Sequence, residues 1–217
     1  WRAAQLKDAG KPCLKEASMA KMFASEMVGR VADRAVQVHG GAGYIAPCVA
    51  ERLYRDVRIF RLYEGTTQIQ QLIIARSLLR RGSSGALGTQ SVCAPGYPFV
   101  SSLPYVADGA GRPVFLLSGL AEHTRNLLAD PHASLLVTEG EGGSFDQARL
   151  TLIGTVARVE LDEASRARYL RYCPESVDYL SLGDFRFFRM EPEKARFIGG
   201  FGRMGWIGAT SPKRFLD

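Results

Sequence analysis

The sequence has few residues of the kinds that bind metals or form crosslinks. It contains 3 histidines and 4 cysteines in 217 residues, and Cys13, Cys48, Cys93 and Cys173 form no C-x-x-C pair. Zinc sites and disulfide frameworks are usually marked by close or regular cysteine spacing. The sequence therefore predicts no metal site and no disulfide framework, and we expect a protein of the reducing cytoplasm.

Long apolar runs are also missing, and no basic segment followed by an apolar one opens the sequence. A bilayer-spanning helix needs about 20 consecutive apolar residues, which no segment provides. The composition, 46% hydrophobic and 23% charged, is that of a folded globular protein. We therefore expect no export signal and no membrane partner.

An excess of positive charge is found only in the first part of the chain. Residues 1–81 contain 14 basic and 7 acidic side chains, whereas residues 82–217 contain 14 and 15. Arg52, Arg55, Arg58 and Arg61 recur at intervals of three, which keeps them on one slowly drifting helical face. A solvated or anion-facing stripe explains this pattern better than a nucleic-acid site, so no nucleic-acid partner is expected.

Helical periodicity dominates the same part of the chain. Apolar residues recur every three or four positions over residues 16–38, and a glycine-rich loop at 39–43 ends this pattern. Thr67 and Gln70 form a capping-box pattern at the start of a later apolar stripe. The sequence predicts three helices, at 16–38, from 49 onward and at 67–81.

Short apolar segments separated by turn residues follow. Residues 82–87 are expected to form a linker, Asp108 and Gly111 bound a hairpin turn, and Gly154 marks a bend between two strands. Such closely spaced strands favour an antiparallel barrel. The expected strands lie at 87–92, 99–106, 113–117, 134–137, 149–153, 155–161, 185–190 and 196–198. Two helices interrupt them, at 121–129 and after Asp162, whose carboxylate can cap the following turn.

Three segments of the helical region, QVHGGAGY (37–44), ERLYRD (51–56) and YEGTTQIQ (63–70), together resemble the C-terminal region of an acyl-CoA dehydrogenase. The resemblance implies that Gly40, Gly41, Thr66 and Gln68 approach FAD and that Glu64 removes a substrate α-proton. Glycine permits close approach, and a helix N-terminus favours a phosphate. The domains that enclose flavin and thioester in that family have no counterpart in this sequence. We therefore expect Glu64 to be a surface or packing residue.

A second resemblance begins at Gly88. The segments GYPFVSSLPY (96–105), LLSGLAEHTRNL (116–127), ARLTLIG (148–154) and GGFGRMGWI (199–207) are similar to FMN-binding split-barrel proteins, especially the haem-utilisation relatives of pyridoxamine 5'-phosphate oxidase. The resemblance implies an FMN cofactor and a homodimer with the flavin at the subunit boundary, where segment 201–206 of the partner completes the pocket. The sequence lacks a pyridoxal-phosphate site and a haem-ligating histidine in its tail. A generic flavin oxidoreductase therefore ranks above haem degradation.

Nine residues are assigned to the flavin site by their positions in that family: Val100, Ser101, Ser102, Ser118, His123, Thr124, Asn126, Arg149 and Trp206. Residues 100–102 would follow the polar edge of the ring. The phosphate or the ribityl chain would be met by Ser118, His123, Thr124 and Arg149. Structural alternatives remain for most of them. Ser118 and Thr124 suit helix caps, His123 a surface position, Asn126 a helix face and Trp206 a core or interface.

The sequence thus predicts an α+β protein, with an antiparallel FMN-binding split β-barrel at 88–217 preceded by an N-terminal helical segment at 1–81. Residues 74–81 suit both the last dehydrogenase helix and the helix before the first barrel strand, so the two patterns share one helix. The leading function is an FMN-dependent oxidoreductase acting on a small-molecule redox substrate. The alternatives are a non-catalytic flavin-binding or structural protein, and an FAD-binding fragment derived from an acyl-CoA dehydrogenase.

Overall fold

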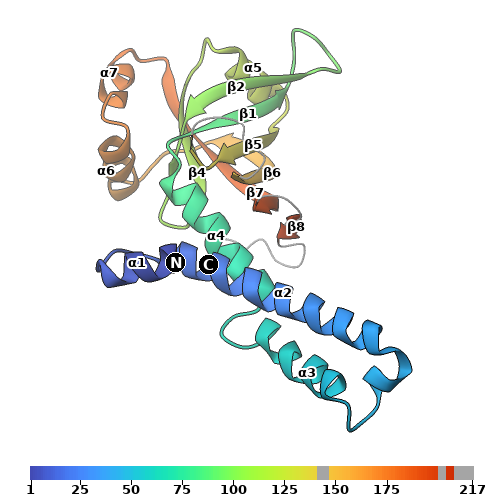
Figure 1. The fold of residues 1–217 in the computed structure, drawn as a ribbon. Helices are drawn as coiled ribbons and strands as arrows, with labels where there is room; N and C mark the ends of the chain where they lie inside the picture. Colours follow the sequence, from blue (N-terminus) through green and yellow to red (C-terminus); the bar gives the residue numbers. More distant parts are fainter. Residues whose placement is uncertain (141–146, 200–203, 208–217) are drawn as a thin grey trace. The chain divides into compact units, whose positions relative to one another are not determined.

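The chain folds into two compact units, residues Trp1–Ile74 and Ala75–Asp217. The structure is a computed structural model that describes residues 1–140, 147–199 and 204–207 (Figure 1). The boundary between the units falls inside one helix, α4 (Thr67–Arg81). No helix in these described ranges combines the length and the apolar character that crossing a membrane would require.

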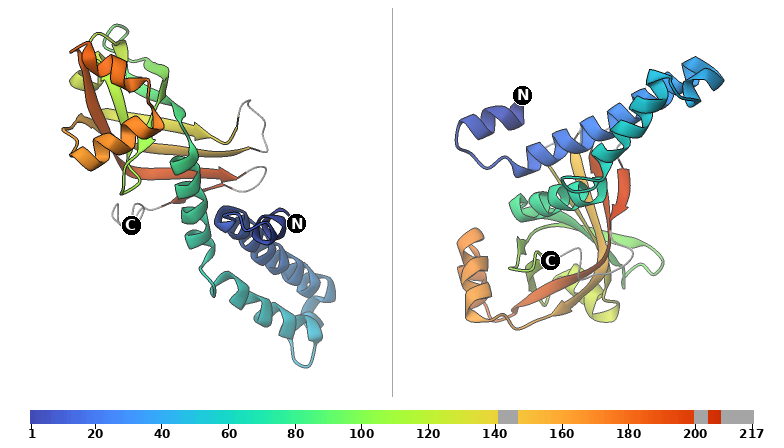
Figure 2. Two further views of the ribbon diagram at one scale, coloured as in Figure 1. Left: turned by 90° about the vertical axis from the view of Figure 1, so that its left-hand side faces the viewer. Right: turned by 90° about the horizontal axis from the view of Figure 1, so that it is seen from below.

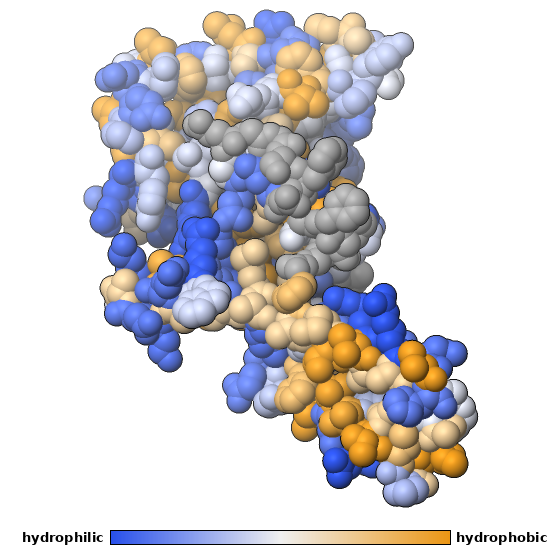
Figure 3. Space-filling model, in the orientation of Figure 1, coloured by the Kyte–Doolittle hydropathy of each residue, from blue (hydrophilic) through white to orange (hydrophobic). Residues whose placement is uncertain are grey.

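The first unit is helical, as predicted. It contains α1 (Arg2–Asp8), α2 (Leu14–His39), the 3-10 helix η1 (Gly40–Tyr44), α3 (Val49–Arg58), the 3-10 helix η2 (Ile59–Arg61) and the start of α4. The helices expected at 16–38, from 49 and at 67–81 correspond to α2, α3 and α4, whereas α1 was not predicted. The unit exposes many hydrophobic side chains, which form patches in the space-filling view (Figure 3).

The glycine loop ends α2 for two separate steric reasons. Gly40 has φ +60°, a left-handed conformation that glycine adopts without strain. At Gly43 a Cβ atom would lie 2.6 Å from the Cβ of His39 and 2.7 Å from the carbonyl oxygen of Val36. A side chain at Gly43 would therefore push η1 away from the last turn of α2.

The start of α4 differs from the predicted capping box by one residue. The hydroxyl of Thr66 accepts a long hydrogen bond of 3.4 Å from the backbone N–H of Ile69. The side-chain amide of Gln70 donates to the carbonyl of Glu64 at 2.9 Å. Thr67 instead donates to the carboxylate of Glu26 on α2 at 2.8 Å. The two adjacent threonines make the pattern ambiguous in the sequence, and the contact with α2 decides between them.

The second unit is an antiparallel sheet that curls into a half-barrel, which confirms the predicted α+β split-barrel fold (Figure 2). The described strands run in the order β2-β1-β5-β6-β7-β4-β3. The strand β8 pairs with the C-terminal half of β7, on the edge that does not pair with β6. Their bounds are β1 (Ser84–Gln90), β2 (Pro98–Pro104), β3 (Val106–Ala107), β4 (Pro113–Ser118), β5 (His132–Thr138), β6 (Ala148–Arg158), β7 (Phe185–Gly199) and β8 (Met204–Ile207).

Three features of the sheet correct the sequence prediction. The two strands expected on either side of Gly154 form the single strand β6, and the two expected at 185–190 and 196–198 form the single strand β7. A register shift at Ile153/Gly154 bends the pair without ending it. The linker expected at 82–87 is shorter, because β1 already begins at Ser84.

Three helices accompany the sheet: α5 (Glu122–Ala129), α6 (Glu163–Tyr172) and α7 (Ser176–Ser181). The predicted cap of α6 is confirmed, since the Asp162 carboxylate accepts a hydrogen bond of 2.7 Å from the Ser165 N–H. Hydrogen bonding from the Ser165 hydroxyl, and then from its backbone N–H, holds the pKa of the Asp162 carboxyl below its ordinary value. The short helix α7 was not predicted.

The core fills the inside of the half-barrel and extends under α6. Its fully buried side chains include Leu87, Phe115, Leu135, Leu150, Leu152, Met190 and Phe197. Under α6, the ring of Tyr169 packs edge-on against Phe187 with centroids 5.2 Å apart, and its hydroxyl accepts a hydrogen bond of 3.2 Å from the Leu116 N–H. Tyr169 thereby attaches α6 to β4 by both packing and a hydrogen bond.

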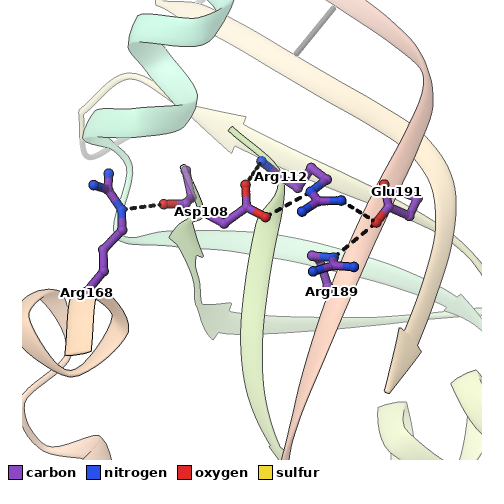
Figure 4. Close-up of polar contacts among 6 residues, drawn as sticks. Asp108, Arg112, Arg168, Arg189 and Glu191 are labelled. Carbon is purple, nitrogen blue, oxygen red and sulfur yellow. Dashed lines mark hydrogen bonds and ion pairs between the residues drawn. The ribbon is translucent and has the colours of Figure 1, made fainter. Parts of the chain in front are cut away.

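The hairpin predicted at Asp108–Gly111 is present between β3 and β4, and a charge network fixes it to β7 (Figure 4). The buried Asp108 carboxylate accepts hydrogen bonds of 2.8 Å from the backbone N–H and from Nε of Arg112. Arg112 also contacts Glu191 at 3.0 Å, and Arg189 contacts the same carboxylate oxygen at 3.0 Å. Every charge in this network has an opposite charge beside it.

Candidate functional site

The sheet of the barrel unit has one covered face and one open face. Along β5, Ala133, Leu135 and Val137 are buried, whereas the residues between them are less buried. Directly paired residues point to the same side of a sheet, so the strand register defines a row across the open face. This row consists of Ser102, Ala86, Leu136, Thr151, Arg196 and Trp206 on β2, β1, β5, β6, β7 and β8.

Four of the nine predicted flavin residues lie on this open face. Val100 is 63% exposed, and Ser102 stands two residues further along the same face of β2. Arg149 alternates with the buried Ala148 and Leu150, which places its side chain on the open side of β6. Its guanidinium Nε is nevertheless buried and has no hydrogen-bond partner in the described part of the chain. Arg149 is thus a half-buried cation with unused donors.

Trp206 is the fourth residue of this face. It is 55% exposed in a single chain, so it is not a core residue. The guanidinium of Arg196, its partner in the β7·β8 ladder, lies over its ring at 5.3 Å from the centroid. This cation–π contact ties the indole to its neighbour on β7. Residues 201–203 of the segment that was expected to complete a partner's pocket lie outside the described residues.

Ser101 and His123 lie on the other side of β2. Nδ1 of His123, in the first turn of α5, is 3.1 Å from the hydroxyl oxygen of Ser101. Burial lowers the pKa of His123 below its ordinary value, because the charged imidazolium loses hydration. Next to it, Thr124 is buried and its hydroxyl has no partner among the residues described. His123 is therefore half-buried and hydrogen-bonded, not a free surface histidine.

Asn126 has a structural position. Its side chain is completely buried. The amide nitrogen donates to the hydroxyl of Thr89 at 3.0 Å, and the amide oxygen accepts from the Val92 N–H at 2.9 Å. These bonds attach α5 to the end of β1 and to the loop after it. The helix-face alternative raised for Asn126 agrees with this arrangement.

The side chain of Ser118 is hydrogen-bonded to Asp184 and Leu120, not to the other eight predicted residues. Its hydroxyl donates to the Asp184 carboxylate at 2.5 Å and accepts from the Leu120 N–H at 3.1 Å. The N-cap residue of α5 is Ala121, so neither Ser118 nor Thr124 caps that helix through its side chain. A phosphate at Ser118 would meet the negative charge of Asp184.

The residues assigned by the dehydrogenase resemblance belong to the helical unit. Glu64 is exposed, has φ +55° and stands at the rim of an apolar groove of about 400 Å³ that Lys21, Met27, Phe60 and Tyr63 help to line. The ammonium of Lys21 donates to the Gly65 carbonyl at 2.6 Å. Gly41 has open space around it, Thr66 precedes α4 and Gln68 is exposed in its first turn. Their proposed contact with FAD stays a prediction.

Several open-face residues were not among the predicted ones. Leu136, Thr151 and Arg196 share the row with Ser102 and Trp206. The alternation in the segment HASLLVT (132–138) was the available signal, since a half-buried strand exposes every second residue. Within residues 1–140, 147–199 and 204–207, no group of three histidine, cysteine or acidic side chains is placed to hold a metal ion.

The helical part of the chain is similar to acyl-CoA dehydrogenases. Residues 1–79 match the family model described as acyl-CoA dehydrogenase, C-terminal domain. The human mitochondrial short-chain specific acyl-CoA dehydrogenase is 55% identical over 80 residues, which are 37% of this chain and 19% of that protein. The chain thus spans about a fifth of the length of the curated relatives it matches.

The barrel is similar to solved split-barrel structures. A heme binding protein from Mycobacterium smegmatis matches with a TM-score of 0.58 and 32% identity, over 65% of this chain and 58% of that one. A Clostridium acetobutylicum protein of the pyridoxinephosphate oxidase family matches with a TM-score of 0.50 and 16% identity, over 64% and 94%, a likeness of fold alone.

One helix is common to both parts, as the sequence predicted. A second family model, described as CREG, beta-barrel, matches residues 67–216 and overlaps the dehydrogenase match at 67–79, within α4. The curled antiparallel sheet that follows α4 is the fold of this second family. The chain therefore belongs to the CREG β-barrel family.

Proposed function

We propose that the barrel unit binds FMN across the open face of its sheet and acts as an FMN-dependent oxidoreductase on a small-molecule substrate. The observation that carries this proposal is the state of Arg149, whose buried Nε has no partner among the described residues. Burying a charged donor without a partner is costly. A phosphate would satisfy the guanidinium through two parallel hydrogen bonds.

The polar edge of the flavin ring would lie along β2. This strand pairs with β1, and no other described strand is bonded to its second edge, so backbone donors and acceptors are available there. Residues 100–102 belong to this strand. β2 lies three strands away from β6, about 14 Å at ordinary strand spacing, so an elongated ligand would reach both β2 and Arg149. Ser101 and His123, on the opposite face of β2, would flank the ring at this strand edge.

Two of the predicted residues make contacts that argue against a flavin role. Asn126 uses its amide groups to attach α5 to β1, and Ser118 is hydrogen-bonded to a carboxylate. Bound FMN would supply the electron transfer, and the chain would bind and orient the cofactor. Arg149 would hold the phosphate charge, and Val100 and Ser102 would position the ring. No protein general base is required for such a reaction.

The proposal includes a homodimer. A ligand on the open face would be covered on one side only, whereas small-molecule sites usually bury most of the ligand surface. The open face also exposes Val100, Leu136, Ile153 and Trp206, each more than a third exposed. A second copy of the chain would cover both these side chains and the flavin.

The purified 217-residue chain tests the proposal directly. We expect a flavin absorbance spectrum, FMN rather than FAD in the extracted cofactor, and oxidation of a nicotinamide donor. Arg149→Met should weaken FMN binding by about tenfold or more, as expected for a lost charge-assisted pair. Arg158→Met, at the exposed other end of β6, should leave binding unchanged. Failure to take up added FMN would rule the proposal out.

The alternatives give different spectra. FMN binding without turnover would leave a non-catalytic flavin-binding protein. Extracted FAD would instead support a site on the dehydrogenase-like unit, at Gly40, Gly41, Thr66 and Gln68. Haem is the second candidate ligand of the barrel, because the similar Mycobacterium smegmatis protein is a heme binding protein. An intense haem absorbance band on addition of hemin, which FMN does not compete away, would favour that candidate.

A further inference from the structure

A cleft lies on the barrel unit, between the end of α4, the β2–β3 segment and α6. Its volume is about 320 Å³, within the range of small-molecule sites. Among its lining residues are Arg80, Tyr105, Ala107, Arg168, Tyr172 and Cys173. None of these belongs to the set assigned to the flavin, so the cleft is a separate feature of the molecule.

The cleft is apolar at its base and positive at its rim. Tyr105, Val106, Ala107 and Cys173 are buried, so their apolar atoms form the base. Three arginines stand around it, and no acidic residue is among the residues that line it in the described part of the chain. Asp108 follows Ala107 directly, but its carboxylate is already paired with Arg112 at 2.8 Å. The arginines are therefore not neutralised by that carboxylate.

Arg168 is held in position with donors to spare. Its Nε donates to the Ala107 carbonyl at 3.0 Å, as Figure 4 shows, and its guanidinium lies 5.4 Å from the centroid of the Tyr172 ring. A guanidinium carries five N–H donors. The contacts of Arg168 within the described residues account for one of them. The guanidinium plane is thus fixed while its terminal nitrogens remain available.

Arginines at a helix C-terminus often cap the last carbonyl groups. That explanation is weakened here, because other groups already bind those carbonyls. The N–H of Gly82 donates to the Leu78 carbonyl at 2.9 Å, and the hydroxyl of Tyr105 donates to the Leu79 carbonyl at 3.0 Å. Arg80 is exposed and makes no hydrogen bond or ion pair with the described residues. Its charge is available at the rim of the cleft.

We propose that this cleft binds a small organic anion, a carboxylate or phosphate group attached to an apolar body. Arg80 and Arg168 bind the anionic group, since guanidinium groups match both kinds of oxyanion. The apolar base contacts the body of the ligand, and the Tyr172 ring, 58% exposed, offers a face for stacking. The site is independent of the proposed flavin site.

The test uses the full chain saturated with FMN, and ligand-observed NMR with calorimetry. Phenyl phosphate, benzoate and the uncharged benzyl alcohol are the probes, and the first two distinguish phosphate from carboxylate recognition. We expect at least one anion to bind with one-to-one stoichiometry and about tenfold more tightly than the alcohol. Arg80→Gln and Arg168→Gln should each weaken that anion by about tenfold. Arg166→Gln, an exposed charge on the same helix as Arg168, should change affinity less than twofold.

Three results would overturn the proposal. Equal binding of the alcohol and both anions would show that charge is not recognised. An equal loss in Arg166→Gln and Arg80→Gln would show that only net charge matters. Binding that disappears when FMN is present would place the anion in the flavin site instead. Because Arg80 is exposed and unpaired in the described structure, its variant should keep the thermal stability of the parent protein, which a melting curve checks.

Discussion

Nδ1 of His123 at the start of α5 lies 3.1 Å from the hydroxyl oxygen of Ser101 on the edge strand β2. Burial lowers the pKa of this histidine below its ordinary 6.5. The neutral imidazole is thus favoured in the folded chain, whereas the unfolded chain protonates at the ordinary pKa. Stability is fully present above pH 6.5 and is lost as the pH falls through the window between the unfolded and the folded pKa.

The expected outcome is a loss of unfolding free energy on acidification that His123→Gln reduces. Urea denaturation at several values between pH 7.5 and pH 5 measures it, at about half-unit steps. An NMR titration of the imidazole should place its midpoint below 6.5. A midpoint at or above that value would contradict the burial of His123 against β2.

Asn126 tests whether its side-chain hydrogen bonds hold α5 against β1. Replacing it with alanine removes the bonds to Thr89 and to the Val92 N–H and leaves a buried hydroxyl and a backbone donor with fewer partners. We expect a loss of about 2–3 kcal/mol in unfolding free energy. Arg125→Ala, at an exposed neighbouring position whose Glu122 contact is 3.9 Å long, should change stability by less than about 0.5 kcal/mol. Equal losses would argue against a role for the Asn126 bonds.

The elements of this fold could be predicted where one local pattern determines them. The apolar period of α2 and the turn residues at Asp108–Gly111 gave the correct helix and hairpin. The division of β7 into two strands was wrong because Pro192 and its charged neighbours break the strand pattern. In the structure Pro192 pairs with Gly154 at the register shift, where a bulge tolerates proline. That tolerance depends on the partner strand and is not visible in the local sequence.

The sequence predicted the spatial arrangement of the candidate site less well than it predicted the helices and turns. Family position grouped Ser118, His123 and Arg149 together, but a position carries no information about the face of the sheet. The alternation of buried and open residues places Arg149 and Ser102 on the open face, opposite to Ser101. The contact between Ser118 and Asp184 joins residues 66 positions apart. No spacing rule in the sequence would have indicated it.

Gly154 is expected to be the glycine of the barrel that tolerates a side chain least. A Cβ atom there would lie 2.1 Å from the carbonyl oxygen of Glu191 and 2.9 Å from the Cα of Pro192, both backbone atoms of the paired strand. Relief requires β6 and β7 to separate at the bulge. Gly154→Ala should therefore lower stability by about 3 kcal/mol or more, or prevent folding.

The matched control is Gly109→Ala in the hairpin turn. A Cβ atom at Gly109 has nothing within 4 Å, and the residue has no positive φ. Its replacement should leave stability within about 0.5 kcal/mol of the parent or raise it slightly, because alanine restricts the unfolded chain. Thermal or urea denaturation of both variants decides the matter. A tolerated Gly154→Ala would mean that the bulge is not packed as described.

The proposed homodimer makes a separate prediction at Leu136, in the middle of the open-face row. Leu136→Arg would place an uncompensated charge in the contact between two copies. We expect the variant to sediment as a monomer and to lose FMN, since one chain covers only one side of the ligand. Leu128→Arg, on the exposed side of α5, adds the same charge outside that face and should leave both the dimer and FMN binding intact. A Leu136→Arg protein that remained a flavin-bound dimer would place the subunit contact on another surface.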